Sequence, residues 1–143
     1  MRQQPDFIGH DPRAAIRELV FHVFATRFDL NTFMNFFHDD AVMHIVGRVA
    51  DYPFSGDYVG RSAIRAVLER MDSEVEQTQG EILNLLIEDD RIAIRRANAL
   101  RHYGTAARMN LMVSDLIRFQ DSKITELHEY IDTTWHERLA GGD

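Results

Sequence analysis

The stretch ARMNLMVSDLIRFQDSKITELHEYID, residues 107–132, consists of two mostly apolar runs joined by Asp121-Ser122. Apolar runs of this length that are bounded by turn residues are typical of β-strands. The stretch therefore predicts two antiparallel strands, over 107–120 and 123–132. Asp115 stands near the centre of the first strand, among residues that favour a dry environment. Because burying an ionisable group without compensation is costly, Asp115 needs a partner or a chemical role.

The segment before this stretch is divided in the same way. Its turn signals are Asp89-Asp90 and Gly104-Thr105. They predict strands over 75–88 and 91–103, so that four consecutive antiparallel strands fill the second half of the chain.

The first half of the chain favours helices. Asp11 can accept hydrogen bonds from the free N–H groups of a first helical turn, and Pro12 fits the first helical position. An apolar stripe at three- and four-residue spacing follows, formed by Ile16, Leu19, Val20, Val23, Phe24 and Phe28. We expect a short second helix in 29–37, a strand in 39–47, an ordered loop in 49–60, and a third helix around Ile64, Val67, Leu68 and Met71.

Three helices followed by an antiparallel meander predict an α+β fold with the helices on one face of a curved sheet. At 143 residues the chain suits a single domain, spanning 1–143, with a sizeable core.

Composition excludes several classes of function. The net charge of −7 argues against a nucleic-acid or anionic-membrane partner, because both need a dense basic surface. The chain has no cysteine, so disulfides, thiolate zinc sites and cysteine nucleophiles are excluded. The first ten residues contain no apolar signal segment, and no run approaches the roughly 18 apolar residues of a membrane span. We expect a cytoplasmic protein.

Side chains on a strand alternate between the two faces of the sheet, so each strand has a predicted inner face. In the strand over 91–103, Arg96 and Asn98 share a face with Ile92 and Ile94. This face begins apolar and turns polar partway along, which predicts that Arg96 and Asn98 lie in a cavity.

The last two strands each place a carboxylate on the inner face. Asp115 is the only polar member of a face that includes Val113 and Ile117. Glu129 shares its face with Leu127 and Ile131. Arg96 can form a structural ion pair with either carboxylate, and strand curvature can let Asp115 reach water. We expect Arg96 to pair with Glu129, which leaves the apolar surroundings to raise the pKa of Asp115.

Three segments together resemble a known family: FFHDDAVMHIVG, GDYVGRSAIRAVL and SDLIRFQDSKITELHEYID. They are similar to the nuclear transport factor two-like superfamily, in particular its SnoaL-like polyketide cyclase and ketosteroid isomerase branches. The resemblance covers about residues 11–135. It implies a cone-shaped α+β fold with an antiparallel or mixed sheet, a deep apolar pocket and a homodimer formed through the sheet.

The resemblance also implies roles for residues. Asp115 matches the aspartic acid with which the isomerase stabilises an oxyanion. The catalytic base of the isomerase falls on His44 or Ile45, depending on a one-residue gap, and His44 with Asp115 would resemble the pair of SnoaL-like cyclases. Tyr58 takes the place of an aromatic residue that closes the pocket. Both His44 and Tyr58 also have structural interpretations, as an exposed strand histidine and as ordinary loop packing.

Limonene epoxide hydrolases share the implied fold and use two aspartates and an arginine. Asp115, Arg96 and Glu129 could imitate that set.

Three functions are therefore open. The first is a cofactor-free and metal-free isomerase, cyclase or hydrolase that acts on a small apolar carbonyl or epoxide compound. Its catalytic groups would be Asp115 with His44 or Glu129. Its substrate would contact Arg96, Asn98, Tyr58, Val113 and Ile117. The second is a non-catalytic binding module for an apolar ligand, and the third is a dimerising scaffold. A pocket acid of perturbed pKa beside a second titratable group would favour the enzyme.

Overall fold

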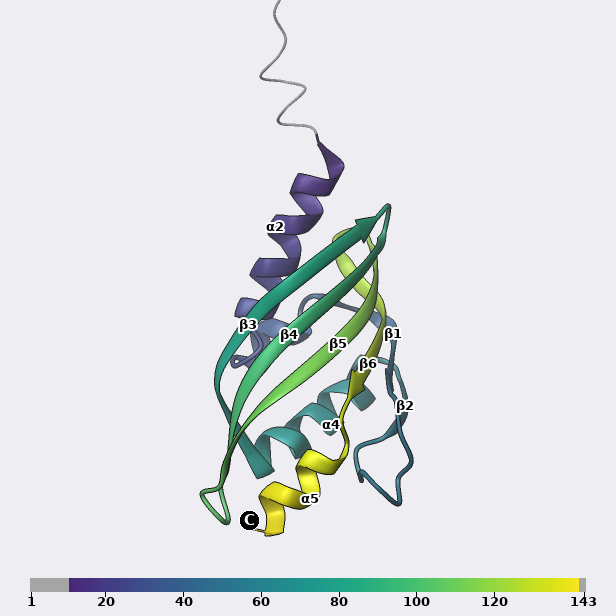
Figure 1. The fold of residues 1–143 in the computed structure, drawn as a ribbon. Coiled ribbons are helices and arrows are strands. Elements are labelled where there is room, and N and C mark those ends of the chain that lie inside the picture. The colour runs from purple at the N-terminus through teal and green to yellow at the C-terminus, as the bar shows by residue number, and fades with distance from the viewer. Residues whose placement is uncertain (1–10, 142–143) are drawn as a thin grey trace, which may run out of the picture.

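The computed structural model describes residues 11–141, with ten ordered elements along the chain (Figure 1). The helices are α2 (Pro12–Ala25), α3 (Leu30–Met34), α4 (Arg61–Glu74) and α5 (Thr134–Gly141). The strands are β1 (Phe37–Ile45), β2 (Gly56–Val59), β3 (Val75–Glu88), β4 (Arg91–His102), β5 (Arg108–Gln120) and β6 (Lys123–Ile131). The first ten and last two residues of the expected domain lie outside the described residues.

Local sequence accounts for the start of α2. The side chain of Asp11 accepts a hydrogen bond from the backbone N–H of Arg13, and Pro12 occupies the first turn, where its missing N–H costs nothing. Val20 and Val23 of the apolar stripe are fully buried. The stripe therefore docks α2 onto the sheet, as its spacing predicts.

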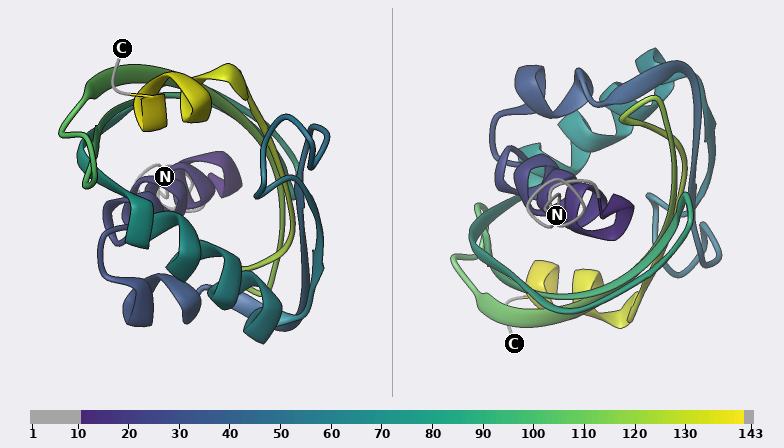
Figure 2. Two further views of the ribbon diagram at one scale, coloured as in Figure 1. Left: turned by 90° about the horizontal axis from the view of Figure 1, so that it is seen from below. Right: turned by 90° about the horizontal axis from the view of Figure 1, so that it is seen from above.

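The strands form one mixed sheet in the order β2-β1-β6-β5-β4-β3. All neighbours are antiparallel except β1 and β6, which are parallel. Figure 2 shows the sheet as an open arc with α2 and α4 on its concave side. Irregularities between Gln77 and Gln79 and between Ile82 and Asn84 interrupt the pairing of β3 with β4. Such irregularities bend a strand and help a long sheet to curve.

The α+β class, the curved sheet and the four long strands of the second half confirm the prediction from sequence. Asp121 and Ser122 both have positive φ angles, as a two-residue hairpin turn of matching twist requires.

Two elements differ from the prediction. The expected loop over 49–60 contains the short strand β2, which pairs with β1 from Val42↔Val59 to Ile45↔Gly56. The helix α5 was not expected. It follows the last strand and buries Trp135 and Leu139. Both elements are short, so their stability depends on tertiary contacts that local patterns do not encode. Within 11–141 no helix is long and apolar enough to cross a membrane.

Candidate active site

Three charged side chains meet on the inner face of the sheet. Arg96 of β4, Asp115 of β5 and Glu129 of β6 come from adjacent strands, and Asp115 lies directly opposite Glu129 in the register. Arg96 is 7% exposed and Asp115 is 1% exposed. We call Arg96, Asp115 and Glu129 the triad.

One guanidinium holds both carboxyl groups of the triad. Arg96 Nε donates to Asp115 Oδ2 at 2.6 Å, and Arg96 Nη2 donates to Glu129 Oε1 at 3.4 Å. The ring of Phe24 lies over the guanidinium, 4.8 Å from centroid to Cζ. The closer partner of Arg96 is therefore Asp115, whereas the sequence suggested Glu129. The reason is that Asp115 lies on the strand next to Arg96 and Glu129 lies one strand further away.

Burial perturbs both carboxyl groups. It raises the pKa of Asp115 above the ordinary value, and the Arg96 guanidinium opposes part of that rise. Burial, and then the negative charge of Asp115, raise the pKa of Glu129 to about 7, although Arg96 and Arg27 favour its ionised form. Since the two acids share one cation, the folded protein keeps a carboxyl proton in the triad up to about pH 7.

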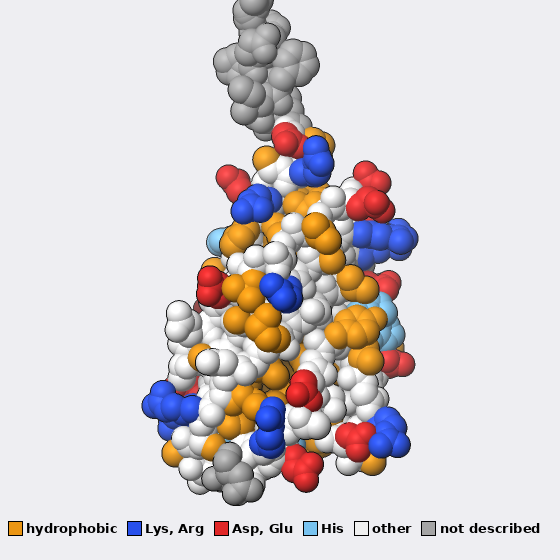
Figure 3. All heavy atoms as spheres, viewed as in Figure 1, with side chains coloured by type: hydrophobic (Ala, Val, Ile, Leu, Met, Phe, Trp, Pro, Cys, Tyr) orange, Lys and Arg blue, Asp and Glu red, His pale blue; other side chains and the backbone are white. Residues whose placement is uncertain are grey.

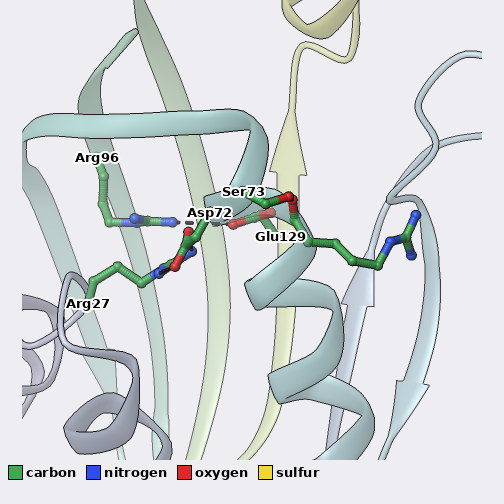
Figure 4. A network of polar contacts seen from close by, with 6 residues as sticks. Arg27, Asp72, Ser73, Arg96 and Glu129 are labelled. Atoms are coloured by element: carbon green, nitrogen blue, oxygen red, sulfur yellow. Dashed lines mark hydrogen bonds and ion pairs between the residues drawn. The ribbon is translucent and has the colours of Figure 1, made fainter. Parts of the chain in front are cut away.

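A second ion pair lies beside the triad (Figure 4). Arg27, in the turn after α2, donates from Nη1 and Nη2 to the two carboxylate oxygens of Asp72 on α4, at 2.9 and 2.8 Å. In Figure 4 the two arginines lie one above the other and extend in the same direction, Arg96 toward Glu129 and Arg27 toward Asp72. Asp72 binds both Nη atoms of Arg27 and so holds the guanidinium in place. The positive charge of Arg27 then favours the ionised form of Glu129 without a direct hydrogen bond.

The triad forms one wall of a cavity of about 50 Å³. The cavity is otherwise mainly apolar, with walls that include Phe33, Met43, Leu68, Leu111, Val113 and Leu127. A buried water needs roughly 10–15 Å³. The cavity therefore has room for a few waters or for the reacting atoms of a ligand, but not for a whole apolar molecule.

Several buried polar atoms of the cavity-lining residues have no hydrogen-bond partner within the described part of the chain. They are Asp115 Oδ1, the hydroxyl of Tyr52 and the indole Nε1 of Trp135. Burial raises the pKa of Tyr52 above its ordinary range, and the nearby charges of Glu129 and Glu74 add to the rise. Tyr52 therefore keeps its proton. Unsatisfied buried polar atoms are costly, so these atoms favour a ligand or water with polar groups.

His44 does not lie in the cavity. In the parallel pairing of β1 with β6, Met43 is opposite Leu127 on the inner face and His44 is opposite His128 on the outer face. The two imidazole rings stack at 4.4 Å, and His44 Nδ1 lies 2.6 Å from Asp57 Oδ1. This corrects the placement of His44 in the pocket. Ile45, the next residue along β1, lies on the inner face and is buried in the core.

Some of the residues expected to contact the substrate line the cavity, and others do not. Asn98 and Val113 line the cavity. Ile117 is buried further along β5 and is not part of the cavity wall. Tyr58 on β2 also lies outside this wall, and its hydroxyl donates to the carbonyl oxygen of Phe54. Tyr58 therefore stabilises the segment before β2.

Arg27 and Asp72 were not predicted as site residues, although a pattern in the sequence indicates them. Arg27 follows the buried Val23 by four residues, and Asp72 follows the buried Leu68 by four. Each continues an apolar stripe with a charge, which predicts a buried ion pair. Tyr52 and Trp135 lie in a loop and a short helix, and no periodic pattern marks them.

The described residues bring together no group of three His, Asp or Glu side chains with the geometry of a metal site.

The comparisons with known proteins agree with this architecture. The family model of the SnoaL-like domain matches residues 16–127. The chain belongs to the SnoaL-like domain family. This places it in the nuclear transport factor two-like superfamily, as the sequence resemblance indicated. None of the curated proteins compared with this SnoaL-like chain matches it.

Solved structures share the fold of this SnoaL-like chain. An NTF2-like protein from Burkholderia xenovorans is 23% identical with a TM-score of 0.70, covering 85% of this chain and 92% of its own. A protein with a ketosteroid isomerase-like fold from Catenulispora acidiphila, in complex with trimethylamine, is 18% identical with a TM-score of 0.67, covering 79% and 84%. Bal32a from a soil-derived mobile gene cassette is 25% identical with a TM-score of 0.72, covering 86% and 95%.

Proposed function

We propose that this SnoaL-like protein is a cofactor-free acid–base enzyme that acts on a small, neutral apolar carbonyl or epoxide compound. The observation that carries the proposal is the pair of buried carboxyl groups, Asp115 and Glu129, held on one guanidinium at a cavity wall. Interacting acids with perturbed pKa values inside a cavity are typical of sites that transfer protons.

The charge balance of the triad supports the proposal. Arg96 stays protonated, so one ionised carboxylate is enough to neutralise it. Ionising both acids would leave a net negative charge in an apolar cavity, which burial disfavours. Up to about pH 7 the triad therefore offers one carboxylate and one carboxylic acid, that is, a base and an acid in contact with the same cation.

This pair can perform two related reactions. With an epoxide, the carboxylate accepts a proton from water, the water oxygen bonds to a ring carbon as the carbon–oxygen bond breaks, and the carboxylic acid protonates the leaving oxygen. With a carbonyl compound, the carboxylate accepts a proton from the α-carbon and the acid donates a hydrogen bond to the enolate oxygen. The unpartnered hydroxyl of Tyr52 supplies a further donor for that oxygen. A cyclase reaction through His44 is not part of the proposal, because His44 lies on the outer face.

The test is turnover with labelled solvent. Small alicyclic epoxides are incubated in ¹⁸O-labelled water and the diols are analysed by mass spectrometry, and cyclic ketones are incubated in D₂O and their α-deuterium is measured by NMR. Glu129→Gln and Asp115→Asn should each lower turnover by roughly 100-fold, because each removes one proton-transfer group. Glu126→Gln is the control, since Glu126 lies on the same strand but contacts His128 on the outer face.

Two results would contradict the proposal. If Glu129→Gln and Asp115→Asn keep full turnover, the triad does not transfer protons. If the wild type binds the compounds saturably and leaves every one unchanged, the cavity belongs to a binding module.

We also propose that the chain forms a homodimer through the outer face of the sheet. Leu86 is 71% exposed, and Met112, Leu116 and Tyr130 are nearly half exposed. Figure 3 shows hydrophobic side chains over the strands that face the viewer in Figure 1. Ala93, Ala97 and Ala99 add small apolar side chains to the same face of β4. Arg95 and Ser114 interrupt this apolar surface, but exposed apolar side chains gathered on one face are typical of a protein interface.

A further inference from the structure

A second hollow lies beside the triad, between α2 with its following turn and the strand β3. It has a volume of about 210 Å³, about four times that of the triad cavity. We call it the lateral hollow. The two spaces share wall residues, which are Phe24, Arg27, Gln77, Arg96 and Asn98. A ligand in the lateral hollow therefore contacts the guanidinium that holds the two catalytic carboxyl groups.

The lateral hollow has an aromatic wall. Phe21, Phe24 and Phe28 are spaced at three and four residues, and all three line it. Phe21 is 41% exposed and Phe28 is 57% exposed. Phe24 packs its ring against the guanidinium of Arg96 and lines both the hollow and the triad cavity. An apolar group placed here would cover aromatic surface that is otherwise in contact with water.

The charges around the lateral hollow favour a neutral ligand. Of the charged residues in its wall, Arg27 is bound by both oxygens of Asp72, and Arg96 is bound by both acids of the triad. The remaining one, Glu81, is exposed. An anionic ligand would have to displace Asp72 from Arg27 or a buried carboxyl group from Arg96, which is costly.

Gly80 keeps the lateral hollow open next to Asn98. Gly80 lies opposite Asn98 in the pairing of β3 with β4. A Cβ atom at this position would come 3.3 Å from Asn98 Oδ1, so even a methyl group would press on that amide. A glycine inside a strand weakens the strand, and it often marks a place where another group approaches closely. Here the missing side chain leaves room on the path from the hollow to the triad.

We propose that the lateral hollow is the subsite for the non-reacting part of the substrate, an uncharged apolar ring or short branched chain, and that the reacting oxygen extends past Asn98 to the triad. The volumes support this division, because the triad cavity holds only the reacting atoms and the hollow can hold the body of the molecule. The inference rests on the proposed function, but binding in the hollow requires no turnover. The two ideas can therefore fail separately.

The experiment measures binding of cyclohexanecarboxamide by calorimetry. Its ring suits the hollow, and its amide can accept from Arg96 and donate to a carboxylate. The wild type should bind it saturably, and Gly80→Val should weaken binding about tenfold or more, the effect of misplaced methyl groups in an apolar pocket. Gln79→Val is the matched control, because Gln79 is an exposed neighbour that lies opposite Ala99 and should not alter binding. Acetamide has no ring, so its binding affinity should be the same for Gly80→Val and the wild type.

A second variant tests the same hollow in case Gly80→Val does not fold. Ala25→Leu fills the hollow from α2, at an exposed position where leucine favours the helix, and it should also weaken binding of the ring. Thermal unfolding establishes that each variant is folded. The inference is overturned if both filling variants bind like the wild type, if Gln79→Val weakens binding equally, or if the wild type does not bind the probe. Loss of turnover in Glu129→Gln with probe binding retained supports both ideas, whereas full turnover in that variant overturns only the proposed role of the triad.

Discussion

Replacing Glu129 with glutamine should make the protein more stable at pH 8, although it removes an ion-pair partner of Arg96. Burial and the neighbouring Asp115 raise the pKa of Glu129 from its ordinary value of 4.5 to about 7. Between these two pH values the folded protein holds a proton that the unfolded chain has released. The free energy of unfolding of the wild type therefore falls as the pH rises through this window.

The size of the effect follows from the width of the window. From pH 4.5 to about pH 7, at about 1.4 kcal/mol per pH unit, ionisation of Glu129 costs the folded state roughly 3–4 kcal/mol. Glutamine has nearly the same shape as the protonated acid and never ionises. The stability difference between Glu129→Gln and the wild type should therefore be small near pH 4.5, favour the variant increasingly up to pH 7, and stay constant above it.

The assay is urea unfolding of both proteins at half-unit steps from pH 4.5 to 8.5. Taking the difference between the two proteins cancels the titration of groups that they share. Glu126→Gln is a control, because a hydrogen bond from His128 holds the pKa of Glu126 below its ordinary value of 4.5; Glu126 therefore titrates below this pH range, and its variant should differ from the wild type by a constant amount. A difference between Glu129→Gln and wild type that does not change with pH, or that favours the wild type at pH 8, would refute the reasoning.

Three further predictions concern the same structure. Arg96→Met should destabilise the fold by about 3–5 kcal/mol in urea unfolding, because it leaves two buried acids without their cation; Arg95→Met, which loses only an exposed contact with Asn84, should cost less than about 1 kcal/mol. Tyr52→Phe should leave the melting temperature unchanged or raise it, since the hydroxyl is buried without a partner among residues 11–141, while it lowers turnover of an epoxide or ketone; a clear loss of stability would mean that the hydroxyl is hydrogen-bonded in the native state. Leu116→Glu should convert a dimer into a monomer at micromolar concentration in sedimentation equilibrium, and a wild type that is already monomeric would contradict the proposed interface.

The alternation of side chains along β4, β5 and β6 was enough to predict that the three triad side chains point to the inner face of the sheet. Each triad residue shares its face of the strand with apolar residues, so its position in the alternation indicates that it lies inside. The same alternation could not decide between His44 and Ile45, which the family resemblance left open, because β1 has apolar residues on both faces: Val42 alternates with Ala41 and Met43. Only the pairing of β1 with β6 decides which set lies inside.

Local sequence patterns were enough to predict the α+β class, the four long strands, the capped start of α2 and the presence of charges inside an apolar sheet. These features depend on contacts between residues a few positions apart, so periodicity and turn residues encode them. Three features of the site could be read only from the folded chain: Arg96 contacts Asp115 more closely than Glu129, Arg27 pairs with Asp72 across 45 positions, and Tyr52 and Trp135 line the cavity. The same holds for the pKa of Glu129, which depends on burial by distant segments and on charges from other strands. The reason is that partner choice and desolvation arise from long-range packing, which a local pattern along the chain does not contain.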